Sequence, residues 1–227
     1  MSLIEGSKLR GEHALFSPST PSWLNYSDDQ FLDALRNKYR ASIGTEIHEW
    51  AGIQVQLGQK VSGVRDAAKS IKTMIFQKYY DERYGLSDFG RALLLHLKYI
   101  PTEAYNTIKA YVNDAVANLM TPEEILDYSD YFFGTCDALY FNEQKGMLKI
   151  FDLKTGSRTA KIEQLFAYAA LYCLKYRVDP FDISTELRIY QNGEVLMNEP
   201  DPKEIRTVMD TIIRFDSLMS KHNKGEL

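Results

Sequence analysis

Residues 131–172 have the sequence YFFGTCDALYFNEQKGMLKIFDLKTGSRTAKIEQLFAYAALY, and this stretch decides the fold that we expect. Apolar, β-rich runs at 131–141 and 147–153 flank Glu143-Gln144-Lys145-Gly146, which has the composition of a short hairpin loop. Thr155-Gly156-Ser157 then interrupts the strand pattern. From Lys161 to Tyr176, residues recur at three- and four-residue steps that place polar side chains at the start of one helix face and apolar side chains further along it. The stretch therefore predicts a β-hairpin followed by an amphipathic helix.

The cross-strand pairs of the hairpin follow when residues are counted outward from its four-residue loop. If Asn142 pairs with Met147, Asp137 lies opposite Asp152. This register also places apolar residues opposite one another on both faces, whereas a one-residue slip would send the two aspartates to opposite faces. The remaining opposite pairs are Phe141 with Leu148, Leu139 with Ile150, Ala138 with Phe151, Cys136 with Leu153, and Thr135 with Lys154.

Two carboxylates facing each other inside an apolar hairpin need an explanation. Like charges directly opposite each other destabilise a sheet, so we expect a cation between Asp137 and Asp152. A hard divalent ion takes oxygen ligands of this kind. The hairpin thus predicts a metal site, for magnesium. The competing interpretation is a buried salt bridge between Asp152 and Lys154.

Length and composition limit the class of protein. A chain of 227 residues with 44% hydrophobic residues can bury a full core, which predicts a single domain over 1–227. The net charge of −4 excludes a globally basic nucleic-acid binder, so any basic surface must be local. Cys136 and Cys173 lack metal-cluster spacing, which predicts a reduced, cytoplasmic protein. Without an apolar signal core or a membrane-length run, we expect no membrane partner.

The chain before the hairpin is predicted to be helical. Ser27-Asp28-Asp29 can cap a helix, and Gly44-Thr45 opens a first core helix over 44–58 that carries His48. Residues 60–120 form a predicted helical insertion with scattered lysines and tyrosines. Such tyrosines could stack on bases, although helical tyrosines more commonly pack against a core. Thr121-Pro122-Glu123-Glu124 predicts another helix start, with proline at the first helical position.

The predicted sheet and helix core spans residues 121–220. Residues 183–191 alternate as a strand, Asn192-Gly193 is a strong hairpin turn signal, and residues 194–197 return. Asp201-Pro202 opens a last helix. Together these elements predict an α/β fold with a central mixed sheet flanked by helices.

Five pieces of the sequence, in this order, carry a family resemblance. They are His48 on an early helix, Gly134-Thr-Cys-Asp137, Asp152-Leu-Lys154-Thr-Gly156, Gln164 and Tyr168. As a set they resemble the motifs of the RecB-type nucleases of the PD-(D/E)xK superfamily, which includes RecB and AddB nuclease domains, CRISPR-associated adaptation nucleases and many phage exonucleases. Residues 12–24 also resemble the opening of phage and prophage members. The resemblance implies a restriction-endonuclease-like core, and a phage-encoded protein acting in the host cytoplasm.

The resemblance also implies a site. One or two Mg²⁺ or Mn²⁺ ions would be held by His48, Asp137, Asp152 and the carbonyl of Leu153. Lys154 would orient water or stabilise the phosphate in the transition state. Gln164 and Tyr168 would position the nucleophile or a backbone phosphate, and Lys161 would add a phosphate contact. Several relatives hold an iron–sulfur cluster, but the cysteines of this chain do not match those positions, so we expect none.

The implied activity is that of a Mg²⁺-dependent deoxyribonuclease. We expect an exonuclease that hydrolyses phosphodiester bonds of DNA during recombination, replication or host-DNA degradation. Its partners would be DNA and a separately encoded single-strand-annealing protein or helicase, and a homo-oligomer is compatible with the sequence. The alternatives are a non-catalytic DNA-end-binding recombination accessory protein with the same fold, and an endonuclease of the same superfamily.

Overall fold

The computed structural model describes residues 15–156 and 159–226. Residues 12–14 and Ser157, which belong to stretches discussed above, lie outside the described residues. The elements in chain order are η2 (Pro21–Asn25), α1 (Asp28–Gln56), α2 (Val64–Tyr79), β1 (Tyr80–Asp81), β2 (Gly85–Leu86), α3 (Asp88–His96), η3 (Leu97–Tyr99), α4 (Thr102–Ala117), β3 (Thr121–Asp127), β4 (Phe133–Asn142), η4 (Glu143–Lys145), β5 (Met147–Lys154), α5 (Glu163–Tyr176), η5 (Pro180–Asp182), β6 (Ser184–Gln191), β7 (Glu194–Asn198) and α6 (Pro202–Asn223).

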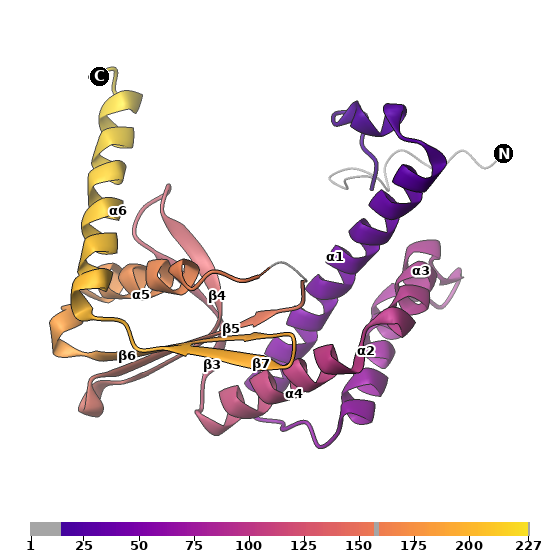
Figure 1. Cartoon of the computed structure of the whole chain (residues 1–227), viewed down its shortest axis with the longest axis horizontal. Helices are drawn as coiled ribbons and strands as arrows, with labels where there is room; N and C mark the ends of the chain where they lie inside the picture. The colour runs from indigo at the N-terminus through magenta and orange to yellow at the C-terminus, as the bar shows by residue number, and fades with distance from the viewer. Residues whose placement is uncertain (1–14, 157–158, 227) are drawn as a thin grey trace.

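A five-stranded mixed sheet forms the centre of the fold, in the order β3-β4-β5-β6-β7 (Figure 1). Strands β5 and β6 are parallel, and the other neighbouring pairs are antiparallel. Helix α5 connects the two parallel strands. This confirms the predicted α/β class with a central mixed sheet flanked by helices.

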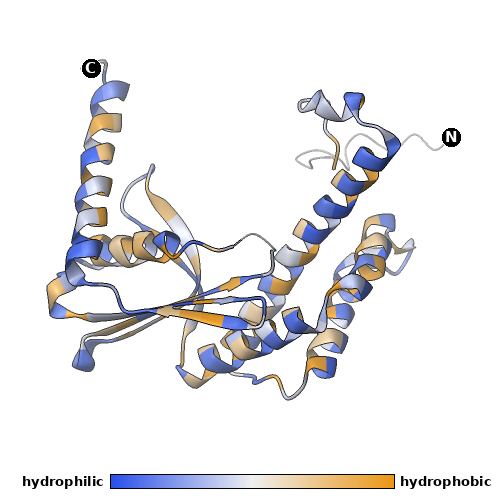
Figure 2. Ribbon diagram, in the orientation of Figure 1, coloured by the Kyte–Doolittle hydropathy of each residue, from blue (hydrophilic) through white to orange (hydrophobic). Residues whose placement is uncertain are grey.

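Helices cover both faces of the sheet and create two hydrophobic cores. On one face, Ile47 of α1, Ile71 of α2 and Val112 of α4 are buried against Phe151 and Tyr190 of the sheet. On the other face, α5 and α6 bury a second core, whose members include Leu165, Ala169, Ile205, Leu148 and Leu187. Hydrophobic colours accordingly concentrate in the central strands, whereas the projecting half of α1 is mainly hydrophilic (Figure 2).

Helix α1 differs from the sequence prediction because it is one continuous helix over Asp28–Gln56, where a separate helix over 44–58 was predicted. Its start is as predicted: the Ser27 side chain caps it by accepting from the Gln30 N–H. Gly44 does not interrupt the helix. A Cβ atom at Gly44 would lie 2.8 Å from Thr155 Oγ1, so the glycine serves a close approach between α1 and the residue that follows β5.

The predicted helix start at Thr121–Glu124 is wrong, because this segment is strand β3 at the edge of the sheet. An edge strand tolerates a proline such as Pro122, since one side of the strand has no ladder to complete. The pairing with β4 passes from Pro122–Ala138 to Glu124–Cys136. Glu123 lies between these pairs in the left-handed region, with φ of 53°. The segment is therefore a strand with a bulge-like irregularity.

The second half of the chain follows the prediction closely. Helix α5 covers Glu163–Tyr176, and Asn192-Gly193 joins β6 to β7 with both residues at positive φ, as a type I′ turn requires. Helix α6 begins after Asp201, whose side chain accepts from the Lys203 N–H. None of the helices among the described residues is both long and apolar enough to cross a lipid bilayer.

Candidate functional site

The predicted register of the β4–β5 hairpin is confirmed from Asn142–Met147 to Ala138–Phe151, where the pairing ends. The facing positions predicted beyond it, including Asp137 opposite Asp152, are not formed as ladder pairs. Instead, the Leu153 N–H donates to Asp137 Oδ2 at 2.7 Å, so a side chain takes the place of a ladder bond. The two strands therefore separate at Asp137.

The irregularity at Glu123 provides the physical reason for this separation. Cys136 packs in the same core as Leu139, on the α5–α6 face, although the two residues are three positions apart and a regular strand would place them on opposite faces. The alternation of β4 is therefore interrupted between these residues, beside Glu123 on the neighbouring strand. The predicted pairing of Cys136 with Leu153 fails for the same reason, since Leu153 belongs to the core on the opposite face.

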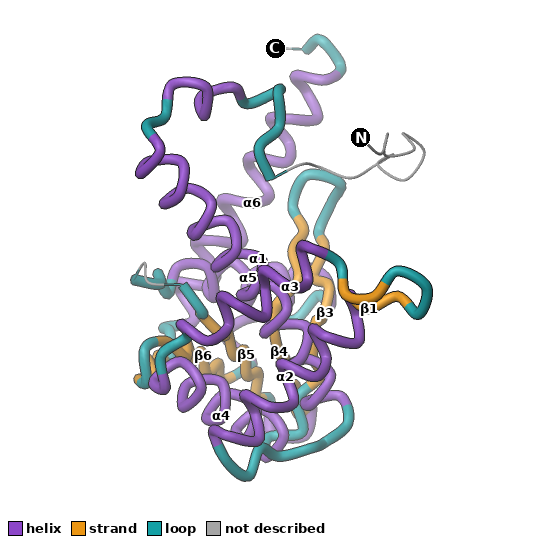
Figure 3. Tube along the Cα trace, turned by 90° about the vertical axis from the view of Figure 1, so that its right-hand side faces the viewer, coloured by secondary structure: helices purple, strands orange, loops and turns teal. Residues whose placement is uncertain are grey.

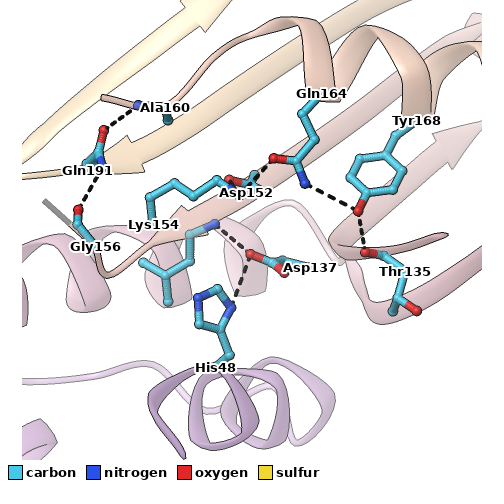
Figure 4. A network of polar contacts seen from close by, with 11 residues as sticks. His48, Thr135, Asp137, Asp152, Lys154, Gly156, Ala160, Gln164, Tyr168 and Gln191 are labelled. Carbon is cyan, nitrogen blue, oxygen red and sulfur yellow. Dashed lines mark hydrogen bonds and ion pairs between the residues drawn. The ribbon is translucent and has the colours of Figure 1, made fainter. Parts of the chain in front are cut away.

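His48 reaches the site from α1. Its Nδ1 lies 3.3 Å from Asp137 Oδ2 (Figure 4). Burial opposes protonation of the imidazole, but the hydrogen bond to Asp137 and the charges of Asp137 and Asp152 outweigh burial, so the pKa of His48 is raised. The two residues form a polar pair between helix and sheet.

Asp152 is the buried carboxylate of the site, with 3% of its surface exposed. Lys154 Nζ lies 2.9 Å from both carboxylate oxygens and makes its hydrogen bond to Oδ1. Burial and the negative charge of Asp137 raise the pKa of Asp152 to about 6, although Lys154 and His48 act in the opposite direction. The ionised form of Asp152 is thus disfavoured despite its ion pair with Lys154.

Gln164 and Tyr168 of α5 complete a directed chain of hydrogen bonds. Lys154 Nζ donates to Gln164 Oε1 at 2.9 Å, and Gln164 Nε2 donates to the Tyr168 hydroxyl at 3.4 Å. The Tyr168 hydroxyl in turn donates to the carbonyl of Thr135 at 2.8 Å. A Cβ atom at Gly134 would lie 3.0 Å from Tyr168 Cε1, which explains why glycine precedes Thr135. Tyr168 is thus held against β4 by its bond to Thr135. It in turn orients the Gln164 amide, which accepts from Lys154.

The structure brings together all the side chains predicted for the site except one. The side chain of Lys161, predicted to contact phosphate, is exposed just before α5, and among the described contacts it does not join the network. The backbone of Leu153 lies beside Asp137 through its N–H. The predicted role of its carbonyl as a metal ligand stays a prediction.

Two residues near the site were missed by the sequence reasoning. Burial and the charge of Asp137 raise the pKa of Glu123, and His48 lowers it, so the three groups share one electrostatic environment. Gln191 accepts from the Ala160 N–H and donates to the Gly156 carbonyl, and thus ties together both ends of the β5–α5 connection. Glu123 was hidden because its segment has a helix-start composition, and Gln191 because it ends a strand remote in sequence.

A cavity of about 530 Å³ opens beside His48 and Glu123. One wall is formed by the side of α1 that carries His48, Glu49 and Gly52, and the other by β3 from Thr121 to Glu123. The cavity therefore adjoins the site at His48, on the α1 side of the sheet.

The described residues offer mixed support for a metal ion. No three His, Cys, Asp or Glu side chains in this part of the chain are grouped as they would be around a metal. However, Asp152 Oδ2 is buried and accepts no hydrogen bond from any described residue, although Lys154 is close. The Lys154 ammonium already lies 2.9 Å from this oxygen, and a carboxylate oxygen paired in this way can also be a ligand of a divalent ion. The donor set, of carboxylates with one imidazole, therefore fits a divalent ion at Asp152 and Asp137.

Comparison with family models, with curated proteins and with solved structures found no match to this chain.

Proposed function

We propose that this chain is a metal-dependent nuclease that hydrolyses phosphodiester bonds of DNA as an exonuclease. The observation that carries the proposal is the convergence of α1, β4, β5 and α5 on one polar network around the buried carboxylate of Asp152 (Figure 4). Carboxylates whose pKa is raised by burial and by a charged neighbour cluster at functional sites, and Asp152 combines such a pKa with Lys154 and His48 where two strands separate.

Asp137 and Asp152 would hold one or two Mg²⁺ or Mn²⁺ ions, with His48 and the Leu153 carbonyl as further ligands. The chemistry that such an ion supplies is polarisation of the phosphate and acidification of water. The proposed restriction-endonuclease-like core is supported by the mixed sheet and by the motif residues at the end of the β4–β5 hairpin.

Lys154 is the group best placed to act on the phosphate directly. Its ammonium is held by Asp152 and Gln164, so it is oriented before substrate arrives. It would donate to a non-bridging phosphate oxygen and stabilise the negative charge that develops during attack. Tyr168 acts as a positioning residue, because it fixes the Gln164 amide that accepts from Lys154.

The direct test is release of nucleotides from linear DNA labelled at the 5′ or the 3′ end, as duplex and as single strand, with Mg²⁺ or with EDTA. We expect Asp152→Ala and Lys154→Ala to lower the rate at least about a hundredfold. Lys145→Ala in the exposed hairpin loop is the matched control and should match wild type. If wild type equals Asp152→Ala and Lys154→Ala on every linear and circular substrate, the enzyme proposal fails. Cutting of closed circular single strands would instead identify an endonuclease.

Metal binding is tested separately by titration calorimetry with Mn²⁺. We expect binding to be lost in Asp137→Ala and kept in Tyr168→Phe, because only the first change removes a ligand. Equal binding by both variants would contradict the assignment of Asp137.

A non-catalytic DNA-end-binding protein is the second candidate. The ion pair between Lys154 and Asp152 favours it, because the lysine neutralises the carboxylate without a metal. In that case wild type would bind DNA ends with the affinity of Asp152→Asn and would release no nucleotides with Mg²⁺ or Mn²⁺.

A further inference from the structure

The outer face of α2 concentrates positive charge in a chain whose net charge is −4. Arg65, Lys69 and Lys72 are exposed and follow one another at four- and three-residue spacing, which places them on one side of the helix. The opposite side buries Ala67, Ile71 and Ile75 in the core. The basic residues therefore form a local surface that faces away from the body of the protein.

Aromatic rings continue this face beyond the last lysine. Phe76 follows Lys72 by four residues and Tyr80 follows Phe76 by four, and the two rings stack with centroids 5.2 Å apart at 20°. Phe76 is 43% and Tyr80 is 47% exposed. Exposed, stacked aromatic rings leave apolar ring surface in contact with water, which a planar ligand could cover.

The short β1–β2 hairpin after α2 carries further aromatic and cationic side chains. Strands β1 and β2 project from the helical layer, with Tyr80 at the first position of β1 (Figure 3). At the tip, the Arg83 guanidinium lies 5.5 Å from the centroid of the Tyr84 ring. Cationic and aromatic side chains thus recur from the helix to the hairpin tip, with Asp81 and Glu82 between Tyr80 and Arg83.

We propose that this α2 face, formed by Arg65, Lys69, Lys72, Phe76 and Tyr80, binds single-stranded DNA. Lysine and arginine attract the phosphate backbone, and aromatic rings stack on bases regardless of their sequence. In a duplex the bases are already stacked on one another, so the aromatic part of the face requires an unpaired strand. Anionic membranes and acidic peptides would engage the cations but would leave the rings without a planar ligand.

Helix α2, whose outer side carries this face, is held against α1 of the candidate site by a residue on its inner side. Lys78, near the end of α2, forms ion pairs with Glu46 and Glu49 of α1. Glu49 lines the cavity beside His48. As a guide for the substrate of that site, the face rests on the proposed nuclease function, and it implies that this substrate includes an unpaired strand.

The test is equilibrium binding of the full chain to a labelled thymidine oligomer in EDTA, measured by fluorescence anisotropy without cleavage. We expect Phe76→Ala with Tyr80→Ala to weaken binding by at least about tenfold, because stacking contributes roughly 1 to 3 kcal/mol per base. The same pair of changes should leave binding to an abasic oligomer of equal length unchanged. Tyr99→Ala, at another exposed tyrosine outside this face, is the matched aromatic control.

Charge is tested with Lys69→Gln and Lys72→Gln. Each should make the slope of log affinity against log salt less negative by about 0.7, the value for one phosphate contact on a single strand. Lys98→Gln is the matched control, at an exposed lysine outside the face. Melting temperatures of all variants establish that the exposed changes leave the fold intact.

These measurements distinguish failure of the α2-face proposal from failure of the nuclease proposal. Loss of oligomer binding in the face variants, with no hydrolysis by wild type in Mg²⁺, supports the face and overturns the nuclease. Hydrolysis by wild type together with unchanged oligomer binding in the folded face variants overturns the face alone. Binding of wild type to anionic vesicles or polyglutamate in preference to the oligomer also overturns it.

Discussion

Opposing electrostatic interactions act on the carboxylate of Asp152. Its pKa lies at about 6 because burial and the charge of Asp137 outweigh the attraction of Lys154 and His48. A carboxylate with a higher pKa in the folded state than in the unfolded state binds protons more tightly when the protein is folded. Its contribution to stability therefore falls as pH rises from about 4 to about 6. At pH 7 the ionised side chain lowers the free energy of unfolding.

The first prediction follows from the loss of stability that ionisation of Asp152 causes in the folded protein. Asp152→Asn should raise the free energy of unfolding at pH 7 in EDTA by about 2 to 3 kcal/mol, and the gain should vanish near pH 4. Urea unfolding at the two pH values measures it. The same variant should lose nuclease activity. If Asp152 were only a structural partner of Lys154, the substitution would lower stability at pH 7.

The second prediction concerns Gly134, which leaves room for the Tyr168 ring. In Gly134→Ala the new Cβ atom would be 3.0 Å from Tyr168 Cε1 and should displace the ring from the Thr135 carbonyl. We expect kcat for DNA hydrolysis to fall about ten- to a hundredfold, the effect of misplacing a positioning group. Gly156→Ala is the matched control, since a Cβ atom there meets no neighbour within 4 Å. Equal kcat in both variants would contradict the role of the close approach.

Two local arrangements of the site could be predicted from the residues themselves, whereas His48, which reaches the site from α1, was expected only from the motif resemblance. The short hairpin loop fixed the register near Asn142 and Met147, and one helical turn fixed Gln164 beside Tyr168. Glu123 could not be predicted, because its left-handed conformation arises only when β3 pairs with β4. The separation of the strands at Asp137 was missed for the same reason.

Among the elements, α1 shows how tertiary contact overrides propensity. Glycine within a helix usually costs about 1 kcal/mol relative to alanine, which favoured a helix boundary near Gly44. The contact of Gly44 with Thr155 gives the glycine a packing reason instead. Because Thr155 directly follows the strand that carries Asp152 and Lys154, α1 helps to place the end of that strand.

The third prediction compares two glycines of this helix. Gly52→Ala should raise stability by about 0.5 to 1 kcal/mol, because its Cβ atom would make only ordinary contacts at 3.6 Å or more. Gly44→Ala should lower stability and activity, because its Cβ atom would lie 2.8 Å from Thr155 Oγ1. Thermal melts and hydrolysis rates measure both. Adding Thr155→Ala to Gly44→Ala should restore stability, and no restoration would contradict the proposed clash.

For the whole molecule, the two cores on opposite faces of the sheet stabilise the site from both sides. Helix α6 belongs to the second core and has no described side chain in the polar network of the site. A change in α6 should therefore affect stability without affecting the chemistry.

The fourth prediction uses two isoleucines of α6. Ile205 is 1% exposed and Ile213 is 42% exposed. Ile205→Ala should lower the free energy of unfolding by about 2 to 5 kcal/mol, whereas Ile213→Ala should change it by less than about 1 kcal/mol. Urea unfolding measures the difference. Below its melting transition, Ile205→Ala should keep the wild-type kcat, and a large loss of kcat would show that α6 is coupled to the site.

The overall architecture was predictable to the level of an α/β fold with a mixed sheet, because turn signals such as Asn192-Gly193 and the capping sequences at Ser27 and Asp201 mark the element boundaries. The edge strand β3 was not predictable, because Pro122 with acidic neighbours is also typical of a helix start. The distribution of helices over the two faces depends on long-range packing that one sequence does not specify.

The parallel pairing of β5 with β6 bears on the order in which the chain folds. A hairpin such as β4–β5 closes a short loop, whereas pairing of β6 with β5 closes a longer loop that contains α5, and its entropic cost favours the hairpin forming first. Leu148→Ala in the hairpin should therefore slow refolding, and Leu165→Ala in α5 should mainly accelerate unfolding, in stopped-flow measurements. In this order of events, the hairpin that carries the two aspartates forms before Gln164 and Tyr168 arrive, so docking of α5 is the step that would complete the proposed site.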